Sequence, residues 1–395
     1  MPKAMPRIKV RISKRATQQP KKLKAGNALP SRPMPKSLIR MPKNLKAMKF
    51  TDGHFTENTW LLPPSLEVLT FDEEFNQRLD GVSLPIYLKE LIFTDRCVFN
   101  QTLNNTTLPI GLTAIVFGKD FNQCLGGTTL PASLESITFG AAFNQSLEKT
   151  TLPVNLAYLI FGCDFNQSLD KTTLPRGLRI LKFGEHFDQS LDRTTLPSGL
   201  RDITFGRDCG HTHRRSHFNQ SLDEATLPSG LEKLTFGSRF DRNVDGTTWP
   251  NGLLDLVFGE SFNQKLNRTR LPSGLQCITF GADFDRSLDD TTLPSSLQTL
   301  NFGFIGPFGD RISSFNQSLN NTTLPNGLRY LRFGNCFNQD LAKTVLPSSL
   351  RHISFGKKYN GGKLAGVVFP KNLESITFGA DRYLAGAKTV TCHEF

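Results

Sequence analysis

A single unit recurs almost verbatim along most of this 395-residue chain, with the consensus TTLPxGLxxLxFGxxFNQSL. Of the fourteen spacings between successive prolines of the unit, nine are 22 residues, two are 31, and three lie between 21 and 24. The prolines are at 42, 63, 85, 109, 131, 153, 175, 197, 228, 250, 272, 294, 325, 347 and 370. A unit this short cannot bury its apolar residues alone, so it must stack on its neighbours. The chain is therefore expected to form one solenoid of about fifteen coils, not several globular domains.

Each coil is expected to contribute one short strand. In residues 200–205 (LRDITF), the L-x-x-L-x-F spacing ends in alternating buried and exposed positions, which is typical of a strand packed on a core. The glycine that follows, Gly206 in this coil, permits a tight and even left-handed corner. Stacking places leucine on leucine and phenylalanine on phenylalanine. The sequence thus predicts a mainly β fold with a continuous parallel sheet and two phenylalanine ladders.

An asparagine follows the second phenylalanine in most coils. At this corner the backbone amides and carbonyls point away from the sheet and need hydrogen-bond partners. Asparagine offers both a donor and an acceptor and can bridge neighbouring coils, so a structural role is preferred over ligand binding. The ladder includes Asn144, Asn166, Asn219, Asn263 and Asn316, and Asp takes the same position at 188, 241 and 285.

The Phe-Asn-x-x-Leu step and the Leu-Pro-x-x-Leu-x-x-Leu-x-Phe-Gly strand resemble the FNIP repeat, a relative of the leucine-rich repeat. The resemblance covers about residues 41–380, and the third letter of the name is usually Gln in this chain. It implies a leucine-rich-repeat-like solenoid that binds other proteins.

The formal charge of +12 belongs to the start of the chain. Residues 1–50 hold 15 Lys and Arg and no Asp or Glu, whereas residues 51–395 hold 32 against 35. A basic groove along the whole solenoid, of the kind that follows a nucleic-acid backbone, is therefore not expected. We expect a basic, disordered arm over 1–34, the solenoid over 35–380 and a C-terminal cap over 381–395.

Short basic clusters mark the arm, at Lys14, Arg15, Lys21, Lys22 and Lys24. They resemble a nuclear localisation signal, and the lack of acidic residues also fits an organelle transit segment. Residues 1–33 are equally suited to hold nucleic acid or an anionic membrane surface, or to form a solvated tail. These alternatives stay open.

The third and fifth positions of each L-x-x-L-x-F segment are expected to form the outer face of the sheet. The fifth is mostly Thr, Ile or Val, which strand propensity explains. The third varies freely, as in a recognition surface, although unselected surface drift gives the same pattern. The candidate partner-binding residues on this face are Tyr158, Lys182, Asp202, Lys233, Tyr330, Arg332 and His352.

Two insertions, 207–217 and 304–314, interrupt the period, and each adds nine residues. Both follow the Phe-Gly of a strand, so both leave the same edge of the solenoid, roughly 20 Å apart. Loops at one edge often mark the binding side, but duplication of a four-coil block would also give equal insertions. Their candidate contact residues are Arg214, Arg215, Phe304, Phe308 and Arg311.

The first insertion also contains Cys209, His211, His213 and His217, which are residue types that bind zinc. Their spacing matches no regular zinc finger, and Arg214 and Arg215 adjoin them. A solvated basic loop is therefore preferred, and no metal or other cofactor is predicted.

A Thr-Thr pair recurs once per coil, and such a ladder on a flat face is a possible ice-binding surface. Thr also suits a turn-to-strand position for its own reasons. The pairs begin at 106, 128, 150, 172, 194, 247, 291 and 322.

No catalytic constellation is visible, because the histidines outside the first insertion are isolated and no phosphate-binding glycine loop occurs. The seven scattered cysteines predict reduced thiols in an intracellular protein, cytoplasmic or nuclear, with organelle import left open. No apolar run approaches the length of about 18 residues that a transmembrane helix needs.

We therefore expect a non-enzymatic scaffold that presents its sheet face and two insertions to a protein partner. The alternative is an anchoring protein that its arm tethers to nucleic acid or to an anionic assembly.

Overall fold

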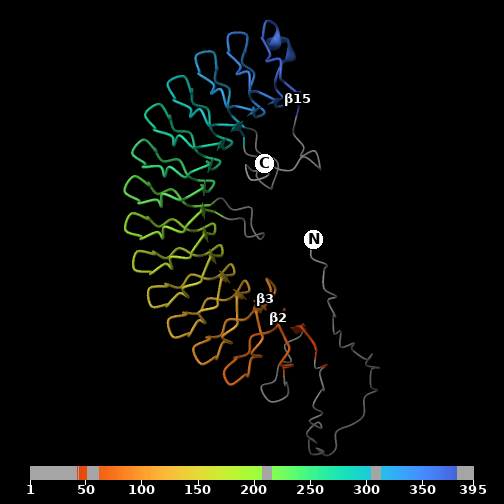
Figure 1. Ribbon diagram of the computed structural model, residues 1–395, viewed down its shortest axis with the longest axis vertical. Coiled ribbons are helices and arrows are strands. Elements are labelled where there is room, and N and C mark those ends of the chain that lie inside the picture. The colour runs from red at the N-terminus through yellow and green to blue at the C-terminus, as the bar shows by residue number, and fades with distance from the viewer. Residues whose placement is uncertain (1–41, 43, 51–61, 207–215, 304–312, 380–395) are drawn as a thin grey trace, which may run out of the picture.

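The computed structural model describes residues 42, 44–50, 62–206, 216–303 and 313–379 of the chain. They form a curved solenoid whose strands line the concave side (Figure 1). Fifteen strands make one sheet in sequence order, and neighbouring strands are parallel. They are β1 (Ala47–Phe50), β2 (Val68–Phe71), β3 (Glu90–Phe93), β4 (Ala114–Val116), β5 (Ser136–Thr138), β6 (Tyr158–Ile160), β7 (Ile180–Lys182), β8 (Asp202–Thr204), β9 (Lys233–Thr235), β10 (Asp255–Val257), β11 (Cys277–Phe280), β12 (Thr299–Phe302), β13 (Tyr330–Arg332), β14 (His352–Phe355) and β15 (Ser375–Phe378). The predicted solenoid with a continuous parallel sheet is confirmed.

The alternation in L-x-x-L-x-F decides which side chains face the core. In β8 the central Ile203 is fully buried, while Asp202 and Thr204 on either side of it are half-buried. Leu181 lies beside Ile203 in the preceding strand, and Leu234 lies beside it in the next. A shift of one residue would turn these apolar side chains outward, so burial of one face maintains the register.

Two phenylalanines per coil form the predicted ladders. Phe139 and Phe143 stack within one coil, with ring centroids 3.7 Å apart. Between coils, the strand phenylalanines Phe139 and Phe161 are 5.6 Å apart, and the second pair, Phe143 and Phe165, is 6.0 Å apart. Neighbouring strands are about 4.8 Å apart, so the spacing widens with distance from the sheet. This widening bends the stack into the arc of Figure 1, with the sheet on the inner side.

The glycine after each strand is required because neighbouring coils approach closely there. A Cβ added to Gly162 would lie 1.8 Å from the carbonyl oxygen of Gly140. No side chain fits at that distance. The left-handed conformation that the sequence permits occurs at Gly206 (φ 77°), Gly303 (φ 113°) and Gly379 (φ 67°), where the regular coil is interrupted. In the regular coils, close packing and not backbone handedness explains the glycine.

The asparagine ladder bridges neighbouring coils, as predicted, and its side chains act as acceptors. Oδ1 of Asn144 accepts hydrogen bonds from the backbone N–H of Asn166 (2.9 Å) and from Nε2 of Gln167 (3.0 Å). A carboxylate oxygen can take the same acceptor role, since Oδ1 of Asp188 accepts a hydrogen bond from the backbone N–H of Asn219 (2.9 Å). Equivalent bonds to the next coil are accepted by Asn166, Asn219, Asn263 and Asn316.

The two 31-residue coils keep the ladders of the 22-residue coils. After the first insertion the chain re-enters at buried Ser216, and the N–H of His217 donates to the carbonyl of Glu185 (2.6 Å). The second insertion ends alike at Ser313, which is buried, and Ser314. Regular coils make the same backbone hydrogen bond at these positions, so the stack continues in register across both insertions.

This re-entry corrects the insertion boundaries. The segments 207–217 and 304–314 were expected to leave the solenoid, but their last two residues belong to the regular coil. Removing the nine residues 207–215 would leave Phe-Gly-Ser-His-Phe, and removing 304–312 would leave Phe-Gly-Ser-Ser-Phe. Both sequences have the F-G-x-x-F spacing of a regular coil.

The threonine pairs form no flat double ladder. The first threonine of each pair is buried. Oγ1 of Thr128 donates to Oδ1 of Asn104 (3.1 Å) and Oγ1 of Thr194 to Oδ1 of Asp170 (2.9 Å), both in the preceding coil. The second threonine is exposed, and the solenoid is curved (Figure 1). One threonine of each pair thus remains exposed, on a curved and not a flat surface, and the ice-binding alternative stays an untested prediction.

Cys163 forms a disulfide. The free thiols among the described residues are Cys97, Cys124, Cys277 and Cys336. The prediction that the cysteines are reduced is therefore wrong at Cys163, and scattered spacing along the sequence was not evidence against a disulfide.

The chain departs from the regular repeat between β14 and β15, where it forms η1 (Gly361–Leu364), a single 3-10 turn. The described residues form no helix long and apolar enough to cross a membrane. In β15 the core positions Ile376 and Phe378 are 37% and 51% exposed, whereas Ile353 and Phe355 of β14 are fully buried. The end of the apolar core is thus accessible at β15.

Candidate binding surface

The outer face of the sheet is the concave surface of the solenoid. Its third-position column reads Ser136, Tyr158, Ile180, Asp202 and Lys233 from β5 to β9. The neighbouring core column is Ile or Leu in every one of these strands. The outer column therefore changes its chemistry at each coil, while the core column does not.

Predicted binding residues from three strands lie together near the middle of this surface. Nζ of Lys182 is 3.4 Å from Oδ2 of Asp202, and Nζ of Lys233 is 3.4 Å from Oδ2 of Asp255. Strands β7 to β10 thus carry alternating charges that neutralise one another. A partner would meet a polar but balanced row of side chains here.

The concave surface is not equally accessible along its length. Asp255 in β10 and Cys277 and Thr279 in β11 are only 5–7% exposed. Tyr158 in β6 is 41% exposed, and Tyr330 in β13 is half-buried. The accessible parts therefore lie on both sides of β10 and β11.

A second group of predicted residues lies on β13 and β14. The rings of Tyr330 and His352 stack with centroids 4.7 Å apart and planes 15° apart. Arg332 lies in the fifth-position column of the same strands, beside Ser354. Six strands, β7 to β12, lie between this group and Tyr158, so the structure arranges the predicted residues as two groups along one surface.

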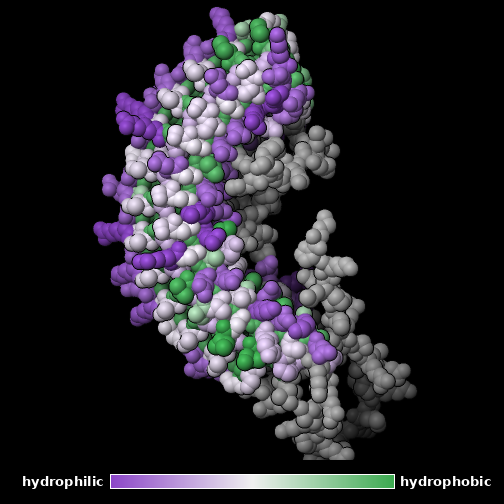
Figure 2. Space-filling view, viewed as in Figure 1, coloured by the Kyte–Doolittle hydropathy of each residue, from purple (hydrophilic) through white to green (hydrophobic). Residues whose placement is uncertain are grey.

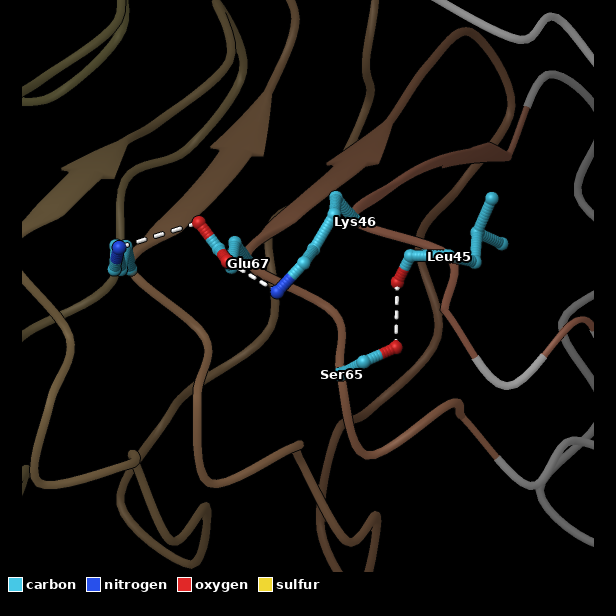
Figure 3. Close-up of polar contacts among 5 residues, drawn as sticks. Leu45, Lys46, Ser65 and Glu67 are labelled. Atoms are coloured by element: carbon cyan, nitrogen blue, oxygen red, sulfur yellow. Dashed lines mark hydrogen bonds and ion pairs between the residues drawn. The ribbon is translucent and has the colours of Figure 1, made fainter.

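Ion pairs link consecutive coils where the first strands begin. Glu67 accepts hydrogen bonds from Nζ of Lys46 (2.6 Å) and Nζ of Lys89 (3.2 Å), which lie in the coils on either side, and Ser65 Oγ donates to the carbonyl of Leu45 (2.9 Å) (Figure 3). The bonds from Lys46 and Lys89 lower the pKa of Glu67 below its ordinary value. These charged side chains already pair with one another, so they offer few unpaired charges to a binding partner.

An exposed apolar stripe, here called the apolar rim, was missed by the sequence reasoning. Ile86, Ile110, Ala132 and Val154 occupy the position after the repeat proline in four consecutive coils, and the three large ones are 61%, 80% and 67% exposed. From the coil of β7 onward this position is polar. The convex edge, by contrast, is lined with hydrophilic side chains (Figure 2). The signal in the sequence was a run of apolar residues at a position that is otherwise Arg, Ser, Asn or Lys, apart from Pro64 in the coil of β2.

Several predicted residues lie outside the described part of the chain. They are Arg214, Arg215, Phe304, Phe308 and Arg311 of the insertions, Cys209, His211 and His213 of the zinc set, and Lys14, Arg15, Lys21, Lys22 and Lys24 of the arm. Their roles stay predictions, as does the anchoring role of residues 1–33. His217 lies in the regular coil, with its ring 4.8 Å from that of His186. No group of three metal-binding side chains gathers among residues that the structure describes.

Burial shifts the pKa values of two titratable side chains of the solenoid. Burial raises the pKa of the Cys97 thiol to about 11, so this thiol stays protonated and a poor nucleophile at neutral pH. Burial likewise raises the pKa of Tyr359 to about 12. What remains on the concave surface is a set of ion pairs and aromatic rings held on a regular sheet.

The coil geometry, with one parallel strand per short repeat on the concave side, defines a solenoid of the leucine-rich-repeat type. The FNIP repeat matches residues 60–95, 99–142, 125–164, 143–175, 165–208, 218–261, 262–304 and 315–358. These matches cover well over half of the chain, so the chain belongs to the FNIP repeat family, as the sequence resemblance implied.

Among solved structures, the chain is similar to CroV588, described as a novel circular leucine-rich-repeat protein. The two are 33% identical with a TM-score of 0.55, and the match covers 86% of this chain but 57% of CroV588. This chain thus spans just over half the length of that relative. YopM from Yersinia enterocolitica (18% identity, TM-score 0.40, 80% of this chain and 65% of YopM) and the internalin InlF from Listeria monocytogenes (12%, 0.42, 80% and 80%) align less well. No curated protein matches the sequence significantly.

Proposed function

We propose that this chain is a non-enzymatic scaffold that binds a protein partner on its concave surface, beside the two insertions. The observation that carries the proposal is the contrast between the third-position outer column, which changes at every coil, and the core column, which stays Ile or Leu. Solenoids of this type present extended concave surfaces on which many side chains can contact one partner.

Exposed aromatic and apolar side chains support a protein as the partner. Tyr158 and Tyr330 lie on the outer face, and the apolar rim lies in the turns that precede the strands of four N-terminal coils. Contiguous exposed apolar groups are uncommon on monomeric proteins unless they mark an interaction site, and tyrosine is enriched among residues that dominate binding energy.

The matching placement of the insertions supports a shared role. Each insertion leaves the solenoid after a left-handed glycine, Gly206 or Gly303, and each returns at a buried serine. The two insertions are four coils apart. They therefore depart from the same edge of the sheet, at the ends of β8 and β12. Loops held at one edge of a rigid solenoid are well placed to contact a molecule that lies on its concave face.

The proposal is tested by comparing four chains as bait in cells that produce this protein. They are the wild type, a chain lacking 207–215 and 304–312, a face variant (Tyr158→Ala with Tyr330→Ala), and a control variant (Arg193→Ala with Arg268→Ala). Arg193 and Arg268 are exposed in turns outside the sheet. Quantitative mass spectrometry should find a protein whose capture falls about tenfold or more with the face variant but not with the control.

The deletion chain then assigns a role to the insertions. Because both deletions restore the F-G-x-x-F spacing, this chain should fold with an unchanged circular-dichroism spectrum. Reduced capture of the same protein would place the insertions in the interface. If all four folded chains capture the same proteins equally, the concave surface is not the binding site and the proposal fails.

A further inference from the structure

The C-terminal coils differ in charge from the rest of the solenoid. Residues 313–379 contain eight Lys and Arg but only two Asp and Glu. Residues 62–206 and 216–303 together contain 18 Lys and Arg against 27 Asp and Glu. The described part of the solenoid is therefore acidic over β2 to β12 and basic over β13 to β15.

A cavity of about 380 Å³ opens in this basic region, where β13 and β14 begin. Its lining combines two arginines, a stacked aromatic pair, a serine and one carboxylate. The residues are Arg329, Tyr330, Ser349, Arg351, His352 and Glu374. Arg329 and Arg351 occupy the same position in neighbouring coils, since the N–H of His352 donates to the Arg329 carbonyl (3.0 Å).

The carboxylate orients part of this lining. Oε1 of Glu374 lies 3.5 Å from Nη1 of Arg351, and its Oε2 lies 3.6 Å from Nε2 of His352. Nη1 of Arg351 also donates to the carbonyl of Asn372 (3.2 Å). One carboxylate thus faces two cationic or titratable groups, and it holds them in place before any ligand arrives.

The remaining arginine is free to bind. The guanidinium of Arg329 makes no hydrogen bond or ion pair with the part of the chain that the structure describes. Beside it, the stacked rings of Tyr330 and His352 form a flat wall, and Nδ1 of His352 is fixed by a hydrogen bond with Oγ of Ser375 (2.8 Å). The cavity therefore offers one unpaired guanidinium, one partly paired guanidinium and an apolar surface.

We propose that this cavity binds carboxylate side chains from an acidic, Asp- or Glu-rich segment of a protein partner. The inference rests on the proposed function and names the chemistry of the partner at one end of the concave surface. Guanidinium groups bind carboxylates through paired, charge-assisted hydrogen bonds.

Length and charge together favour a short acidic segment over a nucleic acid. A backbone phosphodiester and a carboxylate each carry one negative charge, so Glu374 within the cavity does not distinguish them. A long polyanion that continued along the concave surface would meet the acidic coils before β13 and be repelled there. A short acidic segment avoids that penalty.

The test uses the full chain and a fluorescein-labelled polyglutamate peptide of about ten residues, whose binding is followed by fluorescence anisotropy. The pocket variant is Arg329→Ala with Arg351→Ala. The control is Arg268→Ala with Arg270→Ala, which removes the same charge from exposed positions outside the cavity. We expect the pocket variant to bind about tenfold more weakly than the wild type, and the control to change binding less than about twofold.

Several outcomes would overturn the inference. Equal weakening by the two variants would show diffuse electrostatic attraction, to which the basic arm contributes in every chain. Stronger binding of a single-stranded oligothymidylate, lost in the pocket variant alone, would make nucleic acid the occupant. Concentration-dependent self-association that the peptide disrupts would make a second copy of the chain the occupant. If the peptide fails to bind while capture of a partner still depends on Tyr158 and Tyr330, the proposed function stands and this inference alone fails.

Discussion

The two faces of the same sheet follow different rules. On the core face, each Leu, Ile or Phe packs on its counterpart in the next coil, as Phe139 does on Phe161 at 5.6 Å. On the outer face, neighbours in register are as unlike as Tyr158 and Ile180, or Asp202 and Lys233. A core side chain is constrained by copies of itself on both sides, whereas an outer side chain is constrained mainly by strand propensity. The side chains of the core face therefore determine the stability of the solenoid, whereas those of the outer face can vary for recognition.

Among the variants that test this difference between the two faces, Phe143→Ala is expected to lower the stability of the fold most. Phe143 is fully buried and stacks on Phe139 in its own coil and on Phe121 and Phe165 in the neighbouring coils. Its loss should lower the free energy of unfolding by about 3–5 kcal/mol, measured by urea denaturation. Tyr158→Ala on the outer face is the control, with an expected change of about 0.5 kcal/mol or less. Equal losses would contradict the division between the faces.

Gly162→Ala should have the next largest effect. The added Cβ would lie 1.8 Å from the carbonyl oxygen of Gly140, so the two coils would have to separate. Overpacking of this kind costs about 1–3 kcal/mol and should lower the urea midpoint. At Gly361 an added Cβ meets nothing within 4 Å, so Gly361→Ala is the matched control. A wild-type midpoint for Gly162→Ala would show that close approach does not explain this glycine.

The asparagine ladder allows a sharper comparison at one atom. Asn144→Ala removes the acceptor for the N–H of Asn166 and for Nε2 of Gln167, at an expected cost of about 1–3 kcal/mol. Asn144→Asp keeps an acceptor oxygen, as Asp188 does naturally, and should remain close to the wild type at neutral pH. Hydrogen exchange at the Asn166 amide should accelerate in the alanine variant alone. Similar acceleration in both variants would argue against the acceptor role.

The smallest expected effect is a pH dependence at Asp72. Burial alone would raise the pKa of Asp72, but hydrogen bonds from Lys49, Thr94 and the N–H of Glu73 outweigh burial and lower it below the ordinary value of 3.8. A carboxyl with a lowered pKa stabilises the fold above its unfolded pKa, and this stability is lost as the pH falls through the folded pKa. The difference in Tm between wild type and Asp72→Asn should thus be constant near neutrality and shrink below about pH 4. A difference that grows on acidification would refute this.

The sheet could be predicted because the repeat itself contains the required contacts. Because nearly every unit repeats the same Leu and Phe positions, and most carry Asn or Asp after the second Phe, stacking each residue on its counterpart determines the strand order, the register and both ladders. The role of the glycine could not be predicted, because the approach of Gly162 to the Gly140 carbonyl exists only between two coils. The disulfide at Cys163 was missed because the spacing of cysteines along a chain does not show which of them form disulfides in the fold.

The candidate site was harder to predict because binding residues do not repeat. Tyr158 and Tyr330 were correctly assigned to the outer face, but the sequence did not reveal that they belong to separate groups. Glu374, which orients Arg351 and His352, comes from the following coil and occupies an ordinary variable position. Its role depends on side-chain geometry and not on the period.

The return of the chain at Ser216 and Ser313 has a practical consequence. In both coils, extra residues are accommodated between the Phe-Gly corner and the following x-x-Phe, and the coils above and below stay in register. Every regular coil should therefore accept an insertion at the same position, for example between Gly140 and Ala141. A foreign peptide of similar length grafted there should be displayed at the rim of the concave surface, at intervals of about 4.8 Å chosen by the coil.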